Sequence, residues 1–181
     1  MRMDKRELVG ALRDQVVWHE RGDLWYPEYS HWWRNAQLLG AIGQALGELF
    51  ADAEPTVVVG VEAHGMLLGP LAATALGVGF AVVRKGAQPN DIEDPLLRRT
   101  TPPDYKNRGL DLSVRSSLVR RQDRVLFVDD WVDTGAQASA VMALVDDSGA
   151  TWVGVAAAID GTTPEIRQRL TVRSLIRERG L

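Results

Sequence analysis

The chain has no cysteine and only three histidines among its 181 residues. Without cysteine it can form no disulfide bond, no thiolate nucleophile and no zinc site built on sulfur ligands. It also lacks an apolar run of the roughly 18 residues that a membrane-spanning helix requires. Residues 1–6 are mostly charged and do not lead into the apolar core of a signal peptide. We therefore expect a cytoplasmic protein with no membrane partner.

The sequence also lacks a large excess of charge of either sign. Its 21 Lys and Arg against 24 Asp and Glu give a net charge of −3 at pH 7. A chain without a basic excess is not expected to bind nucleic acid non-specifically. Apolar residues make up 45% and charged residues 25%, which is typical of a folded protein, and the length suits one domain. We therefore expect one folded domain without a nucleic-acid partner.

Short β-branched runs alternate with helical apolar patterns along most of the chain. Strands and helices that alternate at this spacing form a parallel sheet with crossover helices. Residues 86–109 have no periodicity and contain four prolines, so we expect a long functional loop there. The pattern predicts a single α/β domain over residues 1–181, with a helical N-terminal part at 1–50. The expected helices are 4–18, 30–50, 66–76, 135–148 and 164–170, and the expected strands are 56–62, 80–83, 110–114, 124–130 and 151–159.

The most informative stretch is residues 125–137, Val-Leu-Phe-Val-Asp-Asp-Trp-Val-Asp-Thr-Gly-Ala-Gln. A buried apolar strand ends in two adjacent carboxylates, Asp129 and Asp130, and a short turn then opens a helix. In an open parallel sheet, ligands bind outside the carboxyl ends of the strands. The unpaired amides of a helix N-terminus suit a phosphate, whereas the two carboxylates suit sugar hydroxyls or a hydrated Mg²⁺. The stretch therefore predicts a ligand site with these two halves.

This stretch resembles the 5-phosphoribosyl-1-pyrophosphate (PRPP) binding motif of type I phosphoribosyltransferases. The resemblance implies their fold, with an N-terminal hood at 1–50 and a flexible loop at 86–109. It implies that Asp129 and Asp130 bind the 2′- and 3′-hydroxyls of the ribose and hold Mg²⁺ through water. The implied activity joins a free nucleobase, a purine, to PRPP with Mg²⁺ and gives a nucleoside monophosphate and pyrophosphate. The residues implied to wrap the 5′-phosphate are Asp133, Thr134, Gly135, Ala136 and Gln137.

A second segment, residues 59–85, resembles adenine phosphoribosyltransferases, from Val-Gly-Val-Glu-Ala-His-Gly at its start to Arg-Lys at its end. The resemblance implies that the turn around Ala63 and His64 is the pyrophosphate loop, which Glu62 orients. It also implies that the Arg-Lys pair begins the path to the mobile catalytic loop. The expected pyrophosphate contacts are Glu62, Ala63, His64, Gly65, Arg84, Lys85 and Arg108.

Three departures from the adenine enzymes leave the base open. His64 stands where those enzymes usually have arginine, and Gln137 stands where they usually have threonine or serine. Asp133 stands where they usually have alanine, and it resembles the Asp-Thr-Gly aspartate of hypoxanthine-guanine and xanthine phosphoribosyltransferases, which lies near purine N7. One segment thus points to adenine as the first choice, and the other points to a 6-oxopurine.

The transfer requires that the leaving pyrophosphate is neutralised and that the base loses a proton. Residues 84–124 hold ten basic and six acidic side chains, a local surplus of four positive charges. This segment is a candidate anion lid that would exclude water, and the alternative is a solvated surface loop. Asp133 is the candidate general base, and a structural cap is the alternative role for its carboxylate.

Half of the aromatic residues, six of twelve, lie within residues 18–33, where the resemblance places a variable hood. Stacking of a base on an aromatic ring contributes about 1–3 kcal/mol. The helical spacing of Tyr29, Trp32 and Trp33 favours contacts in the core or in a dimer over a platform for the base. The candidate base contacts are Trp131, Val132 and Trp32.

The main alternative to an enzyme is a PRPP-sensing regulator, because the same fold occurs in transcriptional regulators that have lost transferase activity. A regulator needs a nucleic-acid-binding element, and residues 1–50 contain only scattered basic residues with no basic recognition helix. A transferase for a specialised heterocycle is a third hypothesis, which the aromatic-rich hood favours. The resemblance implies a homodimer whose other partners are small molecules, PRPP and a nucleobase.

Overall fold

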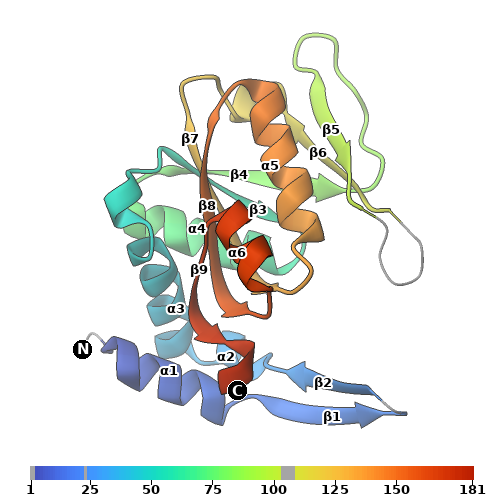
Figure 1. The fold of residues 1–181 in the computed structure, drawn as a ribbon. Helices are drawn as coiled ribbons and strands as arrows, with labels where there is room; N and C mark the ends of the chain where they lie inside the picture. Colours follow the sequence, from blue (N-terminus) through green and yellow to red (C-terminus); the bar gives the residue numbers. More distant parts are fainter. Residues whose placement is uncertain (1–2, 23, 103–108) are drawn as a thin grey trace.

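A seven-stranded sheet forms the centre of the computed structural model, which describes residues 3–22, 24–102 and 109–181. Its strands are β3 Val57–Val61, β4 Gly79–Lys85, β5 Leu96–Thr100, β6 Asp111–Arg115, β7 Arg124–Val132, β8 Thr151–Asp160 and β9 Val172–Arg177. They lie in the order β5-β6-β4-β3-β7-β8-β9 (Figure 1). The five strands from β4 to β9 in this order are parallel, whereas β6 pairs antiparallel with both β4 and β5 at one edge. The predicted α/β class with a central parallel sheet is confirmed.

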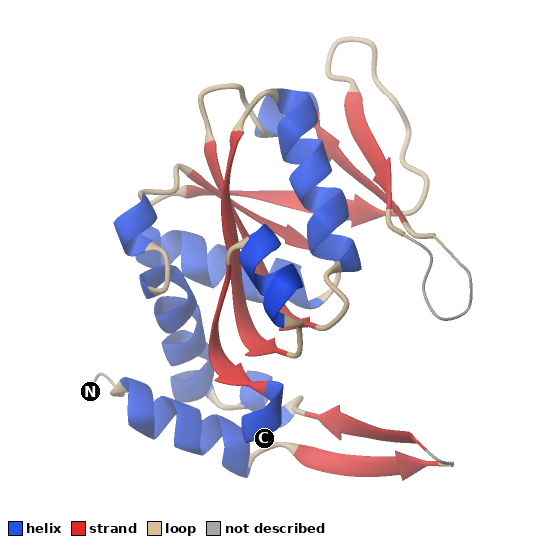
Figure 2. Ribbon diagram, in the orientation of Figure 1, coloured by secondary structure: helices blue, strands red, loops and turns tan. Residues whose placement is uncertain are grey.

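Helices cover both faces of the sheet (Figure 2). The helices are α1 Lys5–Asp14, α2 His31–Arg34, α3 Ala36–Glu48, α4 His64–Leu76, α5 Ala136–Ser148 and α6 Pro164–Leu170. On one face, α1, α3 and α4 pack over Val58 and Leu126, and on the other face α5 and α6 pack over Phe127 and Val155. Because successive strand residues point to opposite faces, a strand covered on both sides is apolar throughout. This accounts for the uninterrupted apolar run that precedes the acidic pair.

The crossover connections diverge between β3 and β7. Helix α4 leads from β3 to β4 in one direction, and α5 leads from β7 to β8 in the other. A reversal of this kind opens a crevice at the carboxyl ends of the two strands, where open α/β sheets bind ligands. The fold therefore brings both sequence motifs to the same end of the sheet, where the parallel strands have their carboxyl ends.

The N-terminal part differs from the two long helices that the sequence predicts. Helix α1 ends at Asp14, and the chain then forms an antiparallel hairpin of β1 (Val17–Arg21) and β2 (Leu24–Glu28). The predicted helix 4–18 was wrong at its C-terminal end. Val16 and Val17 complete the apolar spacing of a helix in the sequence, but in the structure Val16 follows α1 and Val17 begins β1.

The second expected helix, residues 30–50, is divided at Asn35. Its side chain accepts hydrogen bonds of 3.0 and 3.2 Å from the amides of Gln37 and Leu38. An asparagine that accepts such bonds ends one helix and caps the next, so α2 and α3 are separate elements.

Two strands of the central sheet, β5 and β9, were also missed by the sequence reasoning. Strand β5 lies within residues 86–109, which were expected to have no regular structure, and β9 follows α6 directly. Each forms one edge of the sheet. The side chains of β5 are half-buried or exposed, so they show little of the apolar pattern by which a strand is recognised.

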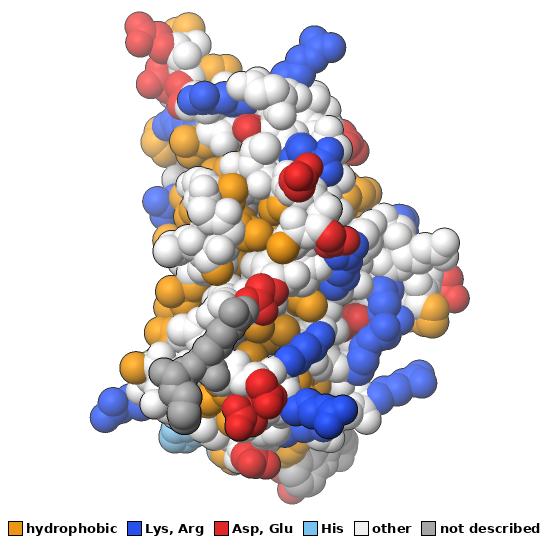
Figure 3. Space-filling model, turned by 90° about the vertical axis from the view of Figure 1, so that its left-hand side faces the viewer, with side chains coloured by type: hydrophobic (Ala, Val, Ile, Leu, Met, Phe, Trp, Pro, Cys, Tyr) orange, Lys and Arg blue, Asp and Glu red, His pale blue; other side chains and the backbone are white. Residues whose placement is uncertain are grey.

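One side of the molecule carries positive and negative side chains next to each other, with apolar side chains between them (Figure 3). A groove of about 1020 Å³ lies between α1, α3 and β9 and is lined partly by Ala41, Ala45 and Leu175. Among the described residues, no helix combines the length and the apolar character needed to cross a membrane.

Candidate active site

The turn between β3 and α4 depends on close backbone packing. A Cβ atom at Gly60 would lie 2.2 Å from the carbonyl oxygen of Gly65, so the start of α4 can lie against β3 only because residue 60 has no side chain. The peptide bond between Glu62 and Ala63 in this turn is cis. The turn presents two exposed residues, Ala63 and His64, at the carboxyl end of β3.

Glu62 ties this turn to β4. Its carboxylate accepts a 2.6 Å hydrogen bond from Arg84 Nη1 and a 2.9 Å hydrogen bond from the backbone amide of Lys85. The amide of Lys85 and then the guanidinium of Arg84 hold the pKa of Glu62 below its usual range. Glu62 therefore stays ionised and fixes two basic residues beside the turn.

The two carboxyl groups at the end of β7 occupy different environments. Asp129 and Asp130 are each 7% exposed, and the Asp130 amide donates a 3.1 Å hydrogen bond to Asp129 Oδ1. Burial, and then the charge of Asp130, raises the pKa of Asp129 well above its usual range, against an opposing effect of Lys85. The site thus contains one carboxyl group that holds its proton more tightly than usual, next to a second carboxyl group.

Asp130 is contacted from two other elements. The Tyr29 hydroxyl donates to its Oδ2 atom at 2.7 Å, and His64 Nδ1 lies 2.6 Å from the same oxygen. Burial, and then the charge of Asp130, raises the pKa of Tyr29, so its hydroxyl remains a donor. One carboxylate therefore joins the segment after β2, the start of α4 and the end of β7.

The loop from Asp133 to Gln137 leads from β7 into α5. Gly135 has a φ of +70° and is the N-cap of α5, so the capping residue itself has no side chain that could accept from the first amides of this helix. A Cβ atom there would also lie 2.8 Å from Ile166 and 2.9 Å from Leu170 of α6. Uncapped amides at a helix N-terminus attract phosphate. The loop is therefore a candidate anion site next to the acidic pair.

Side chains within this loop remain available to a ligand. Asp133 and Thr134 are exposed, and Thr134 Oγ1 accepts a 3.3 Å hydrogen bond from the Ala136 amide. Among the described residues, the Asp133 carboxylate has no hydrogen-bond or ion-pair partner, so it does not act as a helix cap here. A free carboxylate at this position can accept a proton from a bound ligand.

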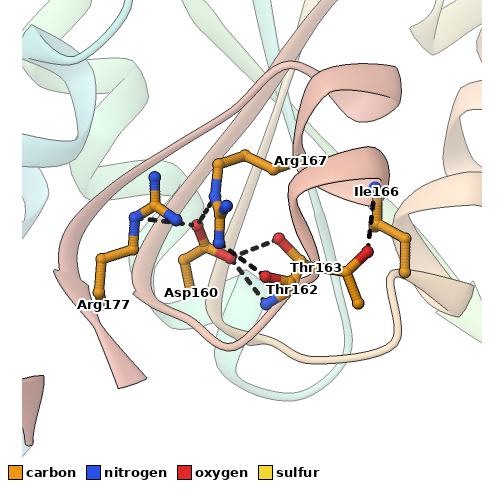
Figure 4. A network of polar contacts seen from close by, with 6 residues as sticks. All are labelled: Asp160, Thr162, Thr163, Ile166, Arg167 and Arg177. Carbon is orange, nitrogen blue, oxygen red and sulfur yellow. Dashed lines mark hydrogen bonds and ion pairs between the residues drawn. The ribbon is translucent and has the colours of Figure 1, made fainter. Parts of the chain in front are cut away.

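A buried carboxylate at the end of β8 holds α6 in place (Figure 4). Asp160 is 2% exposed and accepts hydrogen bonds of 2.6 Å from Thr162 Oγ1 and from Arg167 Nε, while Arg177 Nε lies 3.6 Å away. Burial alone would raise the pKa of Asp160, but the hydrogen bonds from Arg167 and Thr162 outweigh it and hold that pKa below its usual range. Because α6 packs on Gly135, this network also supports the anion site.

The structure separates the three residues expected to contact a base. Trp131 is half-buried, and its ring lies nearly parallel to that of Tyr29, with 6.2 Å between centroids and 27° between planes. Val132 is 4% exposed, and its side chain belongs to the hydrophobic core. Trp32 is fully buried, and its indole Nε1 donates to the Leu12 carbonyl at 2.9 Å. The expectation that Trp32 contacts a base was wrong, because the ring has no exposed face.

The structure brings only some of the basic residues expected around the anion close to the β3–α4 turn. Arg84 and Lys85 lie beside the β3–α4 turn through Glu62. Arg98 and Arg99 on β5 are exposed, and each forms a hydrogen bond within the protein. Two more of the ten basic residues in 84–124, Lys106 and Arg108, lie outside the described residues.

Sequence reasoning assigned Tyr29 to the core or to a dimer contact and so missed its bond to Asp130. The helical spacing with Trp32 and Trp33 was misleading because Tyr29 precedes α2. A signal was present, however: a tyrosine placed among tryptophans buries a hydroxyl group, and a buried hydroxyl requires a polar partner.

Comparison with known proteins points to one family. Residues 33–178 match the phosphoribosyl transferase domain. The adenine phosphoribosyltransferase of Kineococcus radiotolerans is 30% identical over 169 residues, which cover 93% of this chain and 88% of that protein. The xanthine phosphoribosyltransferase of Brevibacillus brevis is 36% identical over 135 residues, which cover 72% of this chain and 66% of that protein.

A solved structure shows the same similarity in three dimensions. The adenine phosphoribosyltransferase of Rhodothermus marinus superposes with a TM-score of 0.78 at 27% identity, covering 94% of this chain and 98% of that chain. Both motifs described above lie within the matched region.

Proposed function

Because the chain belongs to the phosphoribosyl transferase domain family, we propose that this site joins a free purine base to C1 of the PRPP ribose and releases pyrophosphate. The protein is an enzyme of the purine phosphoribosyltransferase type, as its similarity to adenine and xanthine phosphoribosyltransferases indicates. One observation carries the assignment to this site: the acidic pair lies near the end of β7, and the short loop after that strand leads into the N-terminus of α5, whose N-cap is a glycine.

Each half of this arrangement suits one part of PRPP. Asp129 and Asp130 would accept hydrogen bonds from the two ribose hydroxyls, and the amides of residues 135–137 would bind the 5′-phosphate. Across the crevice, Ala63 and Gly65 would offer their backbone, and His64 its imidazole, to the pyrophosphate group, with Arg84 and Lys85 nearby. These roles rest on the match of each position to the family motifs and on its place in the crevice.

The donor set also fits Mg²⁺ if the substrate supplies most of its ligands. Among the described residues, no group of three His, Cys, Asp or Glu side chains could hold a metal ion. The two carboxyl groups could hold a hydrated Mg²⁺ through water, and the hard oxygen atoms of the diol and pyrophosphate could supply the remaining ligands. When bound, the ion would contribute positive charge that offsets the charge of the pyrophosphate.

We assign proton removal from the base to Asp133. Its carboxylate is exposed and unpaired among the described residues, and it follows β7 within the crevice. A general base must reach the proton that it accepts, and this position is open to a ligand held by the acidic pair. Arg84 and Lys85 would offset the negative charge that develops on the leaving pyrophosphate.

The base is proposed to be a purine that lies beside Trp131, with adenine as the first choice. Trp131 immediately follows the acidic pair and keeps part of its ring surface exposed. Support for adenine comes from the β3–α4 segment, whereas Asp133 favours a 6-oxopurine. Val132 would contribute through its backbone because its side chain is in the core.

The proposal also includes a cytoplasmic homodimer. Met66 and Leu67, near the start of α4, are each 37% exposed and could be covered by a second copy. On this proposal, the segment 86–109 closes over the anion and the residues 1–50 form the hood.

The proposed function is tested by calorimetry with PRPP, with and without Mg²⁺, followed by a panel of adenine, hypoxanthine, guanine, xanthine and uracil. Binding of PRPP and release of pyrophosphate with one base would support the proposal and identify the substrate. The variant Asp130→Asn should weaken PRPP binding, whereas Asp52→Asn, at an exposed carboxylate paired with Arg173, should not.

Two results would contradict the proposal. PRPP binding without pyrophosphate release from any base in the panel would favour a PRPP sensor or a specialised heterocycle. Absence of PRPP binding would show that the acidic pair and the anion loop do not form this ligand site.

A further inference from the structure

The Asp130 carboxylate is held on one of its two oxygens only. Both Tyr29 and His64 contact Oδ2, at 2.7 and 2.6 Å. No described side chain outside the acidic pair is hydrogen-bonded to Oδ1, and the neighbouring Asp129 carboxyl is the other group that interacts with this carboxylate. Two contacts to one oxygen fix the plane of the carboxylate and leave the other oxygen available to a ligand.

The tyrosine that makes one of these contacts is itself held in place. Its ring centroid lies 4.9 Å from that of Trp32, which is fully buried. The centroids of Trp33, His64 and Trp131 lie 6.1, 6.2 and 6.2 Å from that of Tyr29. Since Trp32 is anchored through Leu12, the position of the Tyr29 hydroxyl is set by the hydrophobic core. A donor that is fixed before the ligand arrives reduces the entropy lost on binding.

Tyr29 also comes from a different part of the chain than the residues it contacts. It is 101 positions away from Asp130 and directly follows the β1–β2 hairpin. The hydrogen bond therefore connects the N-terminal part of the chain to the strand that carries the acidic pair. No other hydrogen bond between described side chains links residues 15–34 to β7.

We propose that Tyr29 is a positioning residue, whose hydroxyl orients the Asp130 carboxylate so that Oδ1 accepts a hydrogen bond from the ribose diol of PRPP. This inference rests on the proposed function and extends it to a residue outside both sequence motifs. His64 assists from the opposite element, and the buried Trp32 acts as the support of Tyr29.

The variant Tyr29→Phe tests this assignment because it removes the hydroxyl and keeps the ring. A hydrogen bond to a charged acceptor corresponds to roughly a tenfold change in affinity, so the variant should raise the Kd for PRPP about tenfold. Inorganic pyrophosphate has no ribose hydroxyls, so its affinity should not change. Tyr26→Phe is the matched control, because Tyr26 is 46% exposed on the hairpin that precedes Tyr29 and its hydroxyl has no hydrogen-bond partner among the described residues.

The comparison of ligands separates positioning from a general structural effect. If Tyr29→Phe weakened PRPP and pyrophosphate equally, or left both affinities unchanged, the assignment would be wrong. A thermal unfolding curve of each variant shows whether the protein is folded under the conditions of the titration. Absence of PRPP binding by the wild-type protein would contradict the proposed function and this inference together, whereas binding by wild type with no loss in Tyr29→Phe would contradict only the inference.

Discussion

At the scale of single residues, position alone gives similar side chains different chemistry. Asp129, Asp130 and Asp133 lie within five positions of β7 and the loop that follows it. Asp129 is buried with a raised pKa, Asp130 is buried and hydrogen-bonded, and Asp133 is exposed and unpaired among the described residues. The environment of Asp129 favours a protonated carboxyl group, and that of Asp130 favours a hydrogen-bond acceptor fixed in its position. The environment of Asp133 favours a carboxylate that can act as a general base.

The first prediction concerns Asp133. The variant Asp133→Asn should lower the turnover number by about 10²- to 10⁴-fold, the usual contribution of a general base. The Kd for PRPP should change little, because the ribose and phosphate contacts remain. Steady-state kinetics together with calorimetry checks both expectations. Unaltered turnover would rule out the role as general base.

The second prediction concerns the destabilising effect of the ionised Asp129 carboxylate on the folded protein. A carboxyl group whose pKa is raised on folding binds its proton more tightly in the folded state than in the unfolded state. The protonated Asp129 carboxyl group therefore makes its full contribution to the stability of the fold below its usual pKa near 3.8. This contribution is lost as the pH rises through the higher pKa of the folded state. The neutral amide of Asp129→Asn should raise the free energy of unfolding by about 1–2 kcal/mol at pH 8, with no ligand present.

Urea unfolding at pH 4.5 and pH 8 measures this difference. The gain from Asp129→Asn should shrink at the lower pH, where the wild-type carboxyl group is closer to full protonation. The exposed Asp133 provides the control, because Asp133→Asn should leave the free energy of unfolding unchanged at both pH values. An equal gain at both pH values would show that titration of Asp129 is not the cause. A functional residue that destabilises the unliganded fold is a common trade-off.

At the scale of elements, the end of β8 illustrates how a structural network supports a binding loop. Asp160 connects β8 to α6 through Arg167, and α6 packs against Gly135 of the anion loop. The variant Asp160→Ala would leave the Arg167 guanidinium, whose side chain is 19% exposed, without its carboxylate. We expect a loss of about 3 kcal/mol in the free energy of unfolding, because breaking a buried pair leaves one charge uncompensated.

The pH dependence of this contribution has the opposite sign to that of Asp129. The pKa of Asp160 is lowered on folding, so its contribution is present above the usual pKa and is lost as the pH falls through the folded-state value. Urea unfolding at pH 7 and at acidic pH should show that Asp160→Ala loses less stability in acid. Asp52→Ala is the control, since it removes an ion pair in which the aspartate is 69% exposed and should change little. Similar losses in the two variants would contradict this account.

The same scale explains why some elements were predicted and others were not. The core strands β3, β7 and β8 are apolar on both faces, so the sequence pattern alone predicted them. The edge strands β5 and β9 and the β1–β2 hairpin were missed, because a strand with one exposed side carries a weaker pattern and depends on pairing partners elsewhere in the chain.

At the scale of the whole molecule, the proposed dimer can be tested through α4. Leu67 is 37% exposed and lies close to the site, one turn after His64. If a second copy covers it, Leu67→Asp should convert the dimer to a monomer, because it would bury a charge without a partner. Sedimentation velocity measures the state of each protein. Ile92→Asp, at an apolar residue that is 96% exposed in another part of the fold, is the control.

Two results would contradict the dimer proposal at this surface. A wild-type protein that sediments as a monomer at micromolar concentration would contradict the dimer itself. A Leu67→Asp variant that stays dimeric would place the interface elsewhere on the molecule.

The sequence by itself determined the α/β class, the succession of the central strands and helices along the chain, and the two motifs that flank the crevice. It could do so because apolar periodicity and the residues of a turn act between neighbours along the chain. Asp129, Asp130 and the loop at residues 133–137 belong to this group, since a single strand and the start of a single helix place them all.

Only the tertiary structure decided which distant side chains complete the site. The contact of Tyr29 with Asp130 spans 101 positions, and that of His64 with Asp130 spans 66. Local sequence patterns do not predict such contacts, because the contacts depend on strand order and on the packing of the N-terminal segment over the sheet. The same packing buried Trp32 and placed the Tyr29 hydroxyl at the carboxylate.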